Sequence, residues 1–165
     1  LKVLLRAPEV QPHAISLPLK HAKNTIQSKE NIMKTIIRKT PKTMYLPVGN
    51  YSHTTIIPAG MDTYVFSGQI GIGEGGSFPS DFNDEVQQLF KNIKALLDTE
   101  GLSGADITKV NIWSVKEIDW DYFDNEWDKL FGSKYPSMTI AYVTALGLPE
   151  ISIEIDIWAA KHPQG

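Results

Sequence analysis

Residues 134–158, KYPSMTIAYVTALGLPEISIEIDIW, decide the fold that the sequence predicts. The first half is rich in β-branched and aromatic residues from Met138 to Val143, which predicts a strand. The second half, from Ile151 to Trp158, alternates strictly, so its four isoleucines share one face of a strand. The opposite face carries Glu154 and Asp156. Burying an ionised carboxylate is costly unless it is paired, so these two side chains need a specific environment.

Two amphipathic helices are predicted upstream of this stretch. The first has Ser80 or Asp81 as its N-cap and Gly101 just beyond its end, and its apolar side chains recur at helical spacing. The second begins at Asp119 and ends at Gly132, with aromatic side chains along one face. Shorter patterns predict strands at residues 44–48, 54–57, 64–70 and 109–115.

These elements predict an α+β domain in which both long helices cover the same face of a sheet. Strand, helix and strand follow one another twice, and a crossover of this kind joins parallel strands. The uncovered face would still carry apolar side chains, as in the run Tyr64-Val65-Phe66. Large exposed apolar patches usually mark association surfaces, so we expect the uncovered face to be one.

The composition excludes several classes of protein. The 165 residues contain no cysteine, so disulfides, thiolate metal sites and a cysteine nucleophile are excluded. No run of about 18 apolar residues predicts a membrane span. The net charge is −3 in total, although residues 1–32 carry +3 and the remainder therefore −6. Because nucleic-acid-binding domains need a basic face, this charge distribution argues against nucleic acid as a partner.

The first 32 residues differ from the rest of the chain. They contain three prolines, no aromatic side chain and no sustained periodicity. Met33 then opens a segment that resembles a natural start of translation. We therefore interpret residues 1–32 as an N-terminal extension outside the fold, and residues 33–165 as one domain.

Several motifs together resemble the RidA/YjgF family, also called the endoribonuclease L-PSP family. The C-terminal stretch quoted above has Pro136, a β-run, a Leu/Pro turn and then Ile153–Asp156, which is similar to the family's Ile-Glu-Ile-Glu. The resemblance extends over roughly residues 44–160. Further matches are Tyr51-Ser52, the turn at Ser67-Gly68-Gln69-Ile70 and the helix from Asp119 to Phe131.

This resemblance implies a cytoplasmic homotrimer of chorismate-mutase-like subunits, each with a mixed six-stranded sheet and two long helices on one face. It also implies a small-molecule cleft between subunits. The family's deaminases hydrolyse imine and enamine intermediates formed from amino acids. In such a cleft Glu154 would be the catalytic residue that positions water. The resemblance implies ligand contacts for Tyr51, Ser67, Gly68, Gln69, Met138 and Thr139.

Met138 stands where the family's deaminases carry arginine. A guanidinium grips a substrate carboxylate with two parallel charge-assisted hydrogen bonds, whereas a thioether is an uncharged, weak acceptor. Each lost bond to a charged group costs about 1.5–3 kcal/mol, so carboxylate binding should weaken by orders of magnitude. We therefore expect a neutral or less polar ligand, unless Met138 only packs or Lys134 supplies the charge. Asp124 and Trp120, where the family has asparagine and phenylalanine, would alter the polarity further if they face the pocket.

Three functional classes stay open on the sequence alone. The first is hydrolase or deaminase action on a neutral imine, enamine or related labile substrate, with Glu154 orienting water. The second is a small-molecule-binding protein without turnover. The third is an endoribonuclease, which the family's older name suggests; the acidic domain and its single core histidine, His53, disfavour it.

No cofactor and no metal are expected. Residues 71–76 match G-x-G-x-x-G by letter, but residues 77–80 separate them from the helix. A dinucleotide-binding turn starts its helix within the motif, so we interpret residues 71–80 as a flexible loop. The histidines and carboxylates show no metal-ligand spacing.

Overall fold

The computed structural model describes residues 35–163, so the proposed extension at residues 1–32 lies outside the described part of the chain. Within that part, neither long helix is apolar enough to cross a bilayer. In chain order the elements are β1 (Ile37–Lys39), β2 (Thr54–Ile56), β3 (Asp62–Val65), β4 (Gln69–Ile70), α2 (Phe82–Thr99), the 3-10 helix η1 (Gly104–Asp106), β5 (Ile107–Ser114), α3 (Trp120–Phe131), β6 (Ser137–Tyr142) and β7 (Ile153–Lys161).

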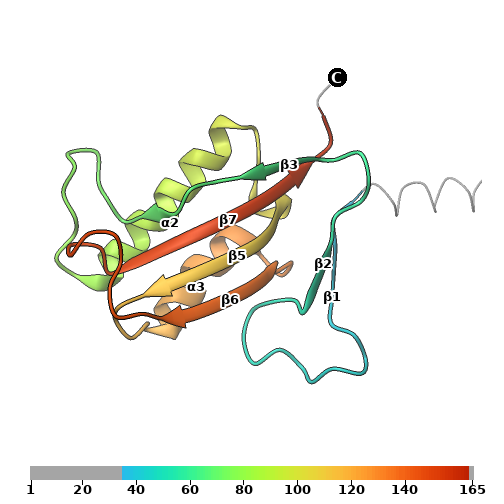
Figure 1. Cartoon of the computed structure of the whole chain (residues 1–165), viewed down its shortest axis with the longest axis horizontal. Coiled ribbons are helices and arrows are strands. Elements are labelled where there is room, and N and C mark those ends of the chain that lie inside the picture. Colours follow the sequence, from blue (N-terminus) through green and yellow to red (C-terminus); the bar gives the residue numbers. More distant parts are fainter. Residues whose placement is uncertain (1–34, 164–165) are drawn as a thin grey trace, which may run out of the picture. The chain divides into compact units, whose positions relative to one another are not determined.

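Strand β7 is central to the larger sheet, whose strands follow the order β3, β7, β5, β6 (Figure 1). Strand β4 lies along the same edge of β7 as β3. It pairs with residues 154–155 near the start of β7, whereas β3 pairs with residues 158–161 at its end. Strand β7 is antiparallel to β3, β4 and β5, whereas β5 and β6 are parallel and are joined through α3. The prediction of an α+β domain with a mixed sheet is confirmed.

The prediction of one six-stranded sheet is wrong. Five strands form the main sheet, and β1 and β2 form a separate antiparallel pair with Arg38 opposite Thr55. The chain leaves β2 through Pro58, which cannot donate to a strand ladder. It then turns at Gly60, whose φ of 84° is in the left-handed region that favours glycine. This break prevents the ladder from running from β2 into β3.

Two further strand predictions differ from the structure. Residues 44–48 form bends and irregular backbone, and the side chain of Val48 is 90% exposed, so no sheet supports a strand there. The strand expected at residues 64–70 is split into β3 and β4, because Ser67 and Gly68 lie outside the ladder. The last strand starts at Ile153, two residues later than expected, and ends at Lys161.

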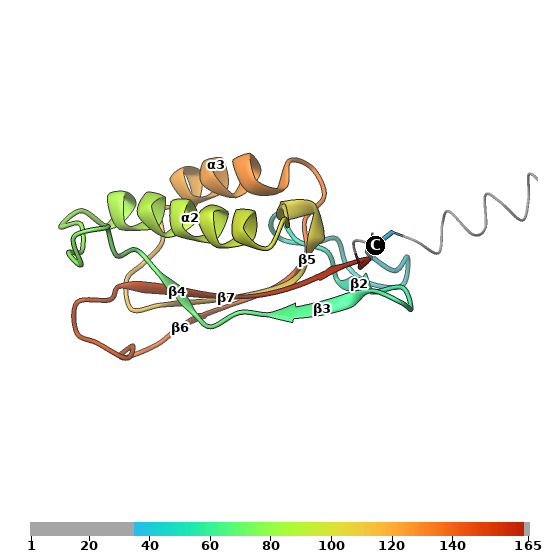
Figure 2. The same ribbon diagram turned by 90° about the horizontal axis from the view of Figure 1, so that it is seen from above.

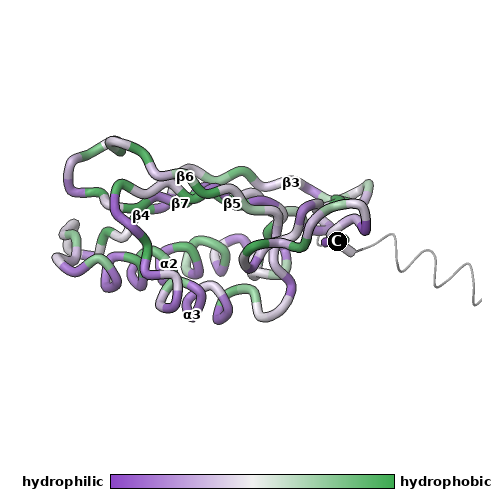
Figure 3. The backbone as a smooth tube through the Cα atoms, turned by 90° about the horizontal axis from the view of Figure 1, so that it is seen from below, coloured by the Kyte–Doolittle hydropathy of each residue, from purple (hydrophilic) through white to green (hydrophobic). Residues whose placement is uncertain are grey.

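Helices α2 and α3 lie side by side on one face of the main sheet, as predicted (Figure 2). Both begin at predicted caps: the Asp81 carboxylate accepts hydrogen bonds from the backbone N–H groups of Asn83 and Asp84, and Asp119 accepts one from Tyr122. Their apolar faces turn toward the sheet (Figure 3). The core between the two layers includes Leu89, Ile93, Ile112, Phe123, Trp127, Ile153, Ile155 and Ile157.

The alternation of β7 separates two environments. Its isoleucines are buried beneath the helices, whereas Glu154, Asp156 and Trp158 are partly exposed on the opposite face. This is the assignment that the sequence predicts. On the neighbouring strand β3, Val65 pairs with Trp158 and is 69% exposed. The open face of the sheet therefore combines carboxylates with exposed apolar side chains.

The packing of η1 against α3 depends on Gly104. A Cβ added at this residue would lie 2.0 Å from the backbone oxygen of Leu130, which cannot yield without moving α3. We expect Gly104→Ala to lower the free energy of unfolding by about 1–3 kcal/mol, measured by urea denaturation. Gly147→Ala is the matched control, since its added Cβ would meet no atom within 4 Å, and it should change stability by less than about 0.5 kcal/mol. Equal stability of the two variants would contradict this packing.

Candidate functional site

The structure separates the predicted site residues. Residues 67–69 and Glu154 lie together where β4 meets β7. Tyr51 and Met138 line one cavity beside α3. Thr139 belongs to neither group. The candidate residues of one chain therefore form two separate groups, which we call the two partial sites.

The first partial site is built on a close approach between Gly68 and Glu154. The register of β4 on β7 places Ile70 opposite Glu154 and Gln69 opposite Ile155. A Cβ added at Gly68 would lie 1.8 Å from Oε1 of Glu154, so only glycine lets the carboxylate occupy this position. The turn is held locally by the side-chain amide of Gln69, which donates to the backbone oxygen of Ser67 at 3.0 Å. The turn and the carboxylate therefore form one unit.

The environment of Glu154 disfavours its charged form. Burial against the turn raises the pKa of the Glu154 carboxyl above its ordinary value, and the negative charge of Asp156 raises this pKa further. The carboxylate of Asp156 accepts a hydrogen bond from Nε1 of Trp113 at 2.8 Å, which fixes its position on the open face. A carboxyl with a raised pKa is better able to accept and return a proton near neutral pH than an ordinary glutamate.

The second partial site is a cavity of about 310 Å³ on the helix side of the sheet. Its walls are largely aromatic and apolar, and among the residues that line it only Asp124 has a carboxyl group and none has a cationic side chain. Such an apolar cavity with few polar groups is typical of small-molecule sites. The cavity is lined by Val48, Gly49, Asn50, Tyr51, Trp120, Phe123, Asp124, Trp127, Met138 and Ile140.

Tyr51 is held at this cavity by its neighbours in the chain. The backbone oxygen of Asn50 accepts a hydrogen bond from Nε1 of Trp127 at 2.9 Å. On the other side, the backbone N–H of Ser52 donates to the backbone oxygen of Pro136 at 2.9 Å. Segment 50–52 is thus tied both to α3 and to the start of β6. Since the ring of His53 packs edge-on against Tyr51, His53 has a packing role in this segment.

Met138 and Thr139 lie on opposite faces of β6. Met138 pairs with Val110 of β5, packs against the core and lines the cavity. Thr139 is exposed on the other face, where its hydroxyl oxygen accepts a hydrogen bond from Nζ of Lys109. Because successive side chains of a strand alternate, the two residues cannot line the same cavity within one chain.

Asp124 and Trp120 both line the cavity. The sequence alone left open whether these two side chains face it. Burial raises the pKa of the Asp124 carboxyl, the charges of Asp128 and Asp121 raise it further, and a hydrogen bond from Asn50 lowers it in part. The cavity therefore has a carboxyl group on its wall and no cation. Sequence reasoning missed Asn50 and Ile140, which reach the cavity through the packing of segment 50–52 and β6 on α3.

No metal site is found within residues 35–163, where no group of three or more histidine, cysteine or acidic side chains is placed to hold an ion. The geometry instead provides a carboxyl group against a tight turn and an apolar cavity with one carboxyl group. These arrangements favour binding and acid–base chemistry on a small organic molecule.

Comparison with known families gives one consistent result. Residues 42–161 match the family described as Endoribonuclease L-PSP. A RutC family protein of Aquifex aeolicus is 35% identical over 133 residues, which cover 74% of this chain and 97% of the relative. A protein of Dermatophagoides farinae named 2-iminobutanoate/2-iminopropanoate deaminase is 30% identical over 102 residues, covering 61% of this chain and 77% of that protein.

Solved structures support the same fold. A Rid family protein of unknown function, YyfB from Yersinia pestis, superimposes with a TM-score of 0.67 at 24% identity, over 76% of this chain and 98% of that one. RidA from an Antarctic Psychrobacter superimposes with a TM-score of 0.54 at 24% identity, over 74% and 98% of the two chains. At this identity the likeness concerns the fold alone.

The raised pKa of Glu154 predicts a pH-dependent loss of stability. The folded state holds this proton more tightly than the unfolded chain, so the free energy of unfolding should fall as the pH rises from about 4.3, the ordinary glutamate value, through the higher pKa of the folded state. Glu154→Gln stays neutral and should remove this decline, as measured by urea unfolding at a series of pH values. Asp156→Asn should make this decline smaller, because it removes the negative charge that contributes to the raised pKa of Glu154. An unchanged profile in Glu154→Gln would contradict the assignment.

Proposed function

The chain belongs to the RidA/YjgF family, also called the endoribonuclease L-PSP family, and on this premise we propose that it acts as a homotrimer with a small-molecule cleft between subunits. The observation that carries the proposal is the separation of the two partial sites. Glu154 lies on the open face and Met138 on the helix face of the same sheet, so one chain cannot bring them together.

Association through the open face would solve this problem. The open face of one subunit would pack against the β6 edge of the next, so that its Gly68–Glu154 unit faces the Tyr51–Met138 cavity there. The exposed apolar side chains of that face, such as Val65, favour such an association. The trimer is testable by sedimentation equilibrium, where we expect three times the chain mass of 18.4 kDa. A stable monomer at micromolar concentration would remove the basis for the shared cleft.

Within this cleft Glu154 would direct the hydrolysis of a carbon–nitrogen double bond. Its carboxylate accepts a proton from a water molecule while the water oxygen bonds to the imine carbon. The same proton is then returned to the nitrogen, which gives a carbinolamine. Its hydroxyl proton next passes to the nitrogen, the carbon–nitrogen bond breaks as the carbon–oxygen double bond forms, and the products are an amine or ammonia and a carbonyl compound. The raised pKa of Glu154 supports both halves of this proton transfer.

The cavity determines which substrate fits. The carboxylate-bearing imines in the name of the Dermatophagoides relative need a cationic partner, and this cavity offers Met138 and the Asp124 carboxyl instead. An anion would meet the Asp124 carboxyl group, which offers no positive charge, and no compensating donor at Met138. We therefore infer a neutral imine, enamine or related labile compound. A protein that binds such a compound without turnover is the second candidate, supported by the same loss of the cation.

Restoring the cation tests the substrate inference. Ammonia release from 2-iminopropanoate, generated in the assay mixture by an amino-acid oxidase, should be low for the unmodified protein. The double variant Met138→Arg, Asp124→Asn should release it at least about tenfold faster, because a guanidinium adds charge-assisted hydrogen bonds to the substrate carboxylate. Met138→Leu is the matched control and should leave the rate low.

Three results of this assay have distinct meanings. Adding Glu154→Gln to the double variant should abolish the gain, which would assign the proton transfer to Glu154. High activity of the unmodified protein, lost in Glu154→Gln, would overturn the inference of a neutral substrate. A double variant that binds 2-oxobutanoate but releases no ammonia would favour the binding protein over the enzyme.

A further inference from the structure

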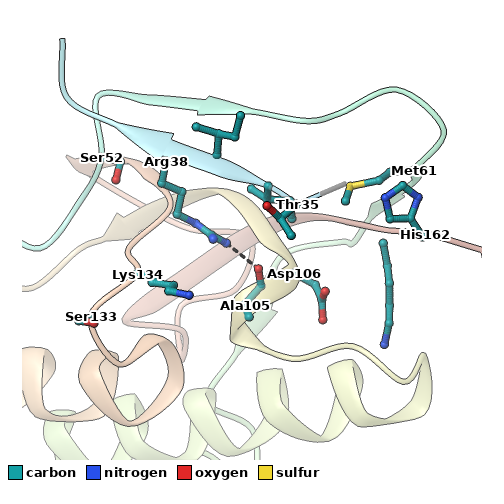
Figure 4. Close-up of a pocket in the computed structure, with 12 residues that line it drawn as sticks. Thr35, Arg38, Ser52, Met61, Ala105, Asp106, Ser133, Lys134 and His162 are labelled. Carbon is teal, nitrogen blue, oxygen red and sulfur yellow. Dashed lines mark hydrogen bonds between the residues drawn. The ribbon is translucent and has the colours of Figure 1, made fainter. Parts of the chain in front are cut away.

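A second and larger cavity lies away from the two partial sites. It has a volume of about 790 Å³ and is formed where β1, η1, the loop after α3 and the end of β7 meet (Figure 4). This volume is in the range of small-molecule sites. Ser52 reaches its wall from segment 50–52, and no part of the proposed function uses this cavity.

Arg38 lines the cavity and is the arginine among its lining residues (Figure 4). Its Nη2 donates hydrogen bonds to the backbone oxygens of Ala105 at 2.8 Å and Ile107 at 2.6 Å, which anchors the side chain across η1. Its Nε is buried and has no hydrogen-bond partner in the described part of the chain. A buried N–H without a partner is costly, and a guanidinium keeps its charge at physiological pH. The protein therefore fixes the position of the guanidinium but leaves one of its hydrogen-bond donors, Nε, without a partner in the described part of the chain.

The other charged side chains around Arg38 leave a positive excess. Lys134 and Lys161 also line the cavity, against the single carboxylate of Asp106. Asp106 is already engaged, because its Oδ2 accepts hydrogen bonds from the backbone N–H of Ser103 at 2.8 Å and from the Ser103 hydroxyl at 2.9 Å. This positive cavity stands out in a domain whose net charge is −6. Complementary charge is what recruits an anionic ligand to such a site.

We propose that this cavity binds the phosphate or carboxylate group of a small metabolite, with Arg38 as the anchor and Lys134 as the second cation. Nζ of Lys161 already donates to the backbone oxygen of Gly101, so this lysine contributes mainly its charge. The site is independent of the proposed cleft, and it would bind an anion although the cleft excludes one.

The position of Ser52 links the two cavities. Tyr51 lines the cavity beside α3, and the next residue, Ser52, lines the anion cavity. The hydroxyl of Ser52 donates to the backbone oxygen of Tyr135 at 2.8 Å, one residue after Lys134. An anion held by Lys134 therefore lies close to the segment that positions Tyr51.

Arginine side-chain NMR of the full chain tests the site directly. Arg6 and Arg38 are the arginines of the sequence, so the ¹⁵Nε–H spectrum has two resonances and Arg38→Met assigns them. We expect titration with inorganic phosphate or with succinate at low ionic strength to shift the Arg38 resonance in a saturable manner. Whichever probe binds more tightly identifies the group that the cavity accepts.

Matched variants make the test specific. Arg38→Met should weaken binding about tenfold or more, measured by calorimetry, because it removes a charge-assisted fork. Lys134→Met leaves the two carbonyl contacts of Arg38 intact and should weaken binding about threefold. This variant tests the proposal even if Arg38→Met fails to fold. Lys39→Met removes a charge from the same strand on an exposed side chain and should change affinity by less than about twofold. Absence of a saturable shift with both probes, or equal losses in Lys39→Met and Lys134→Met, would overturn the proposal.

Discussion

The alternation of β7 is the constraint on which the rest of this structure depends. Its isoleucines must lie beneath α2 and α3, because they supply the middle of the core. With period two, Glu154 and Asp156 are then forced onto the open face. A shift of one residue would bury both carboxylates and expose the isoleucines. The strand thus fixes the position of the candidate catalytic group through the hydrophobic effect and not through the chemistry of that group.

The same constraint divides the candidate site. Met138 packs with the helices and Glu154 faces away from them, so the sheet itself lies between the two side chains. Gly68 then lets the chain pass so close to Glu154 that the carboxylate and the turn act as one unit. This separation of the two groups within one chain is the physical reason for proposing a site shared between copies.

The helices were predictable from sequence because their signals are local. Asp81 and Asp119 accept hydrogen bonds within the next few residues, and the apolar spacing that follows needs no tertiary information. The strands near the N-terminus were less predictable. Residues 44–48 have the composition of a strand but find no partner, and the run 64–70 is interrupted where Glu154 approaches Gly68. Strand formation depends on distant partners, which a local pattern does not contain.

By itself the sequence determined the family, the two capped helices and the faces of β7, because each follows from local spacing or from motifs read along the chain. Only the tertiary structure decided that Asp124 and Trp120 face the same cavity as Met138, that Thr139 does not, and that Arg38 reaches η1 from β1. These relations join residues from 14 to 69 positions apart. They are set by how the elements pack, since packing brings together side chains that no periodicity along the chain connects.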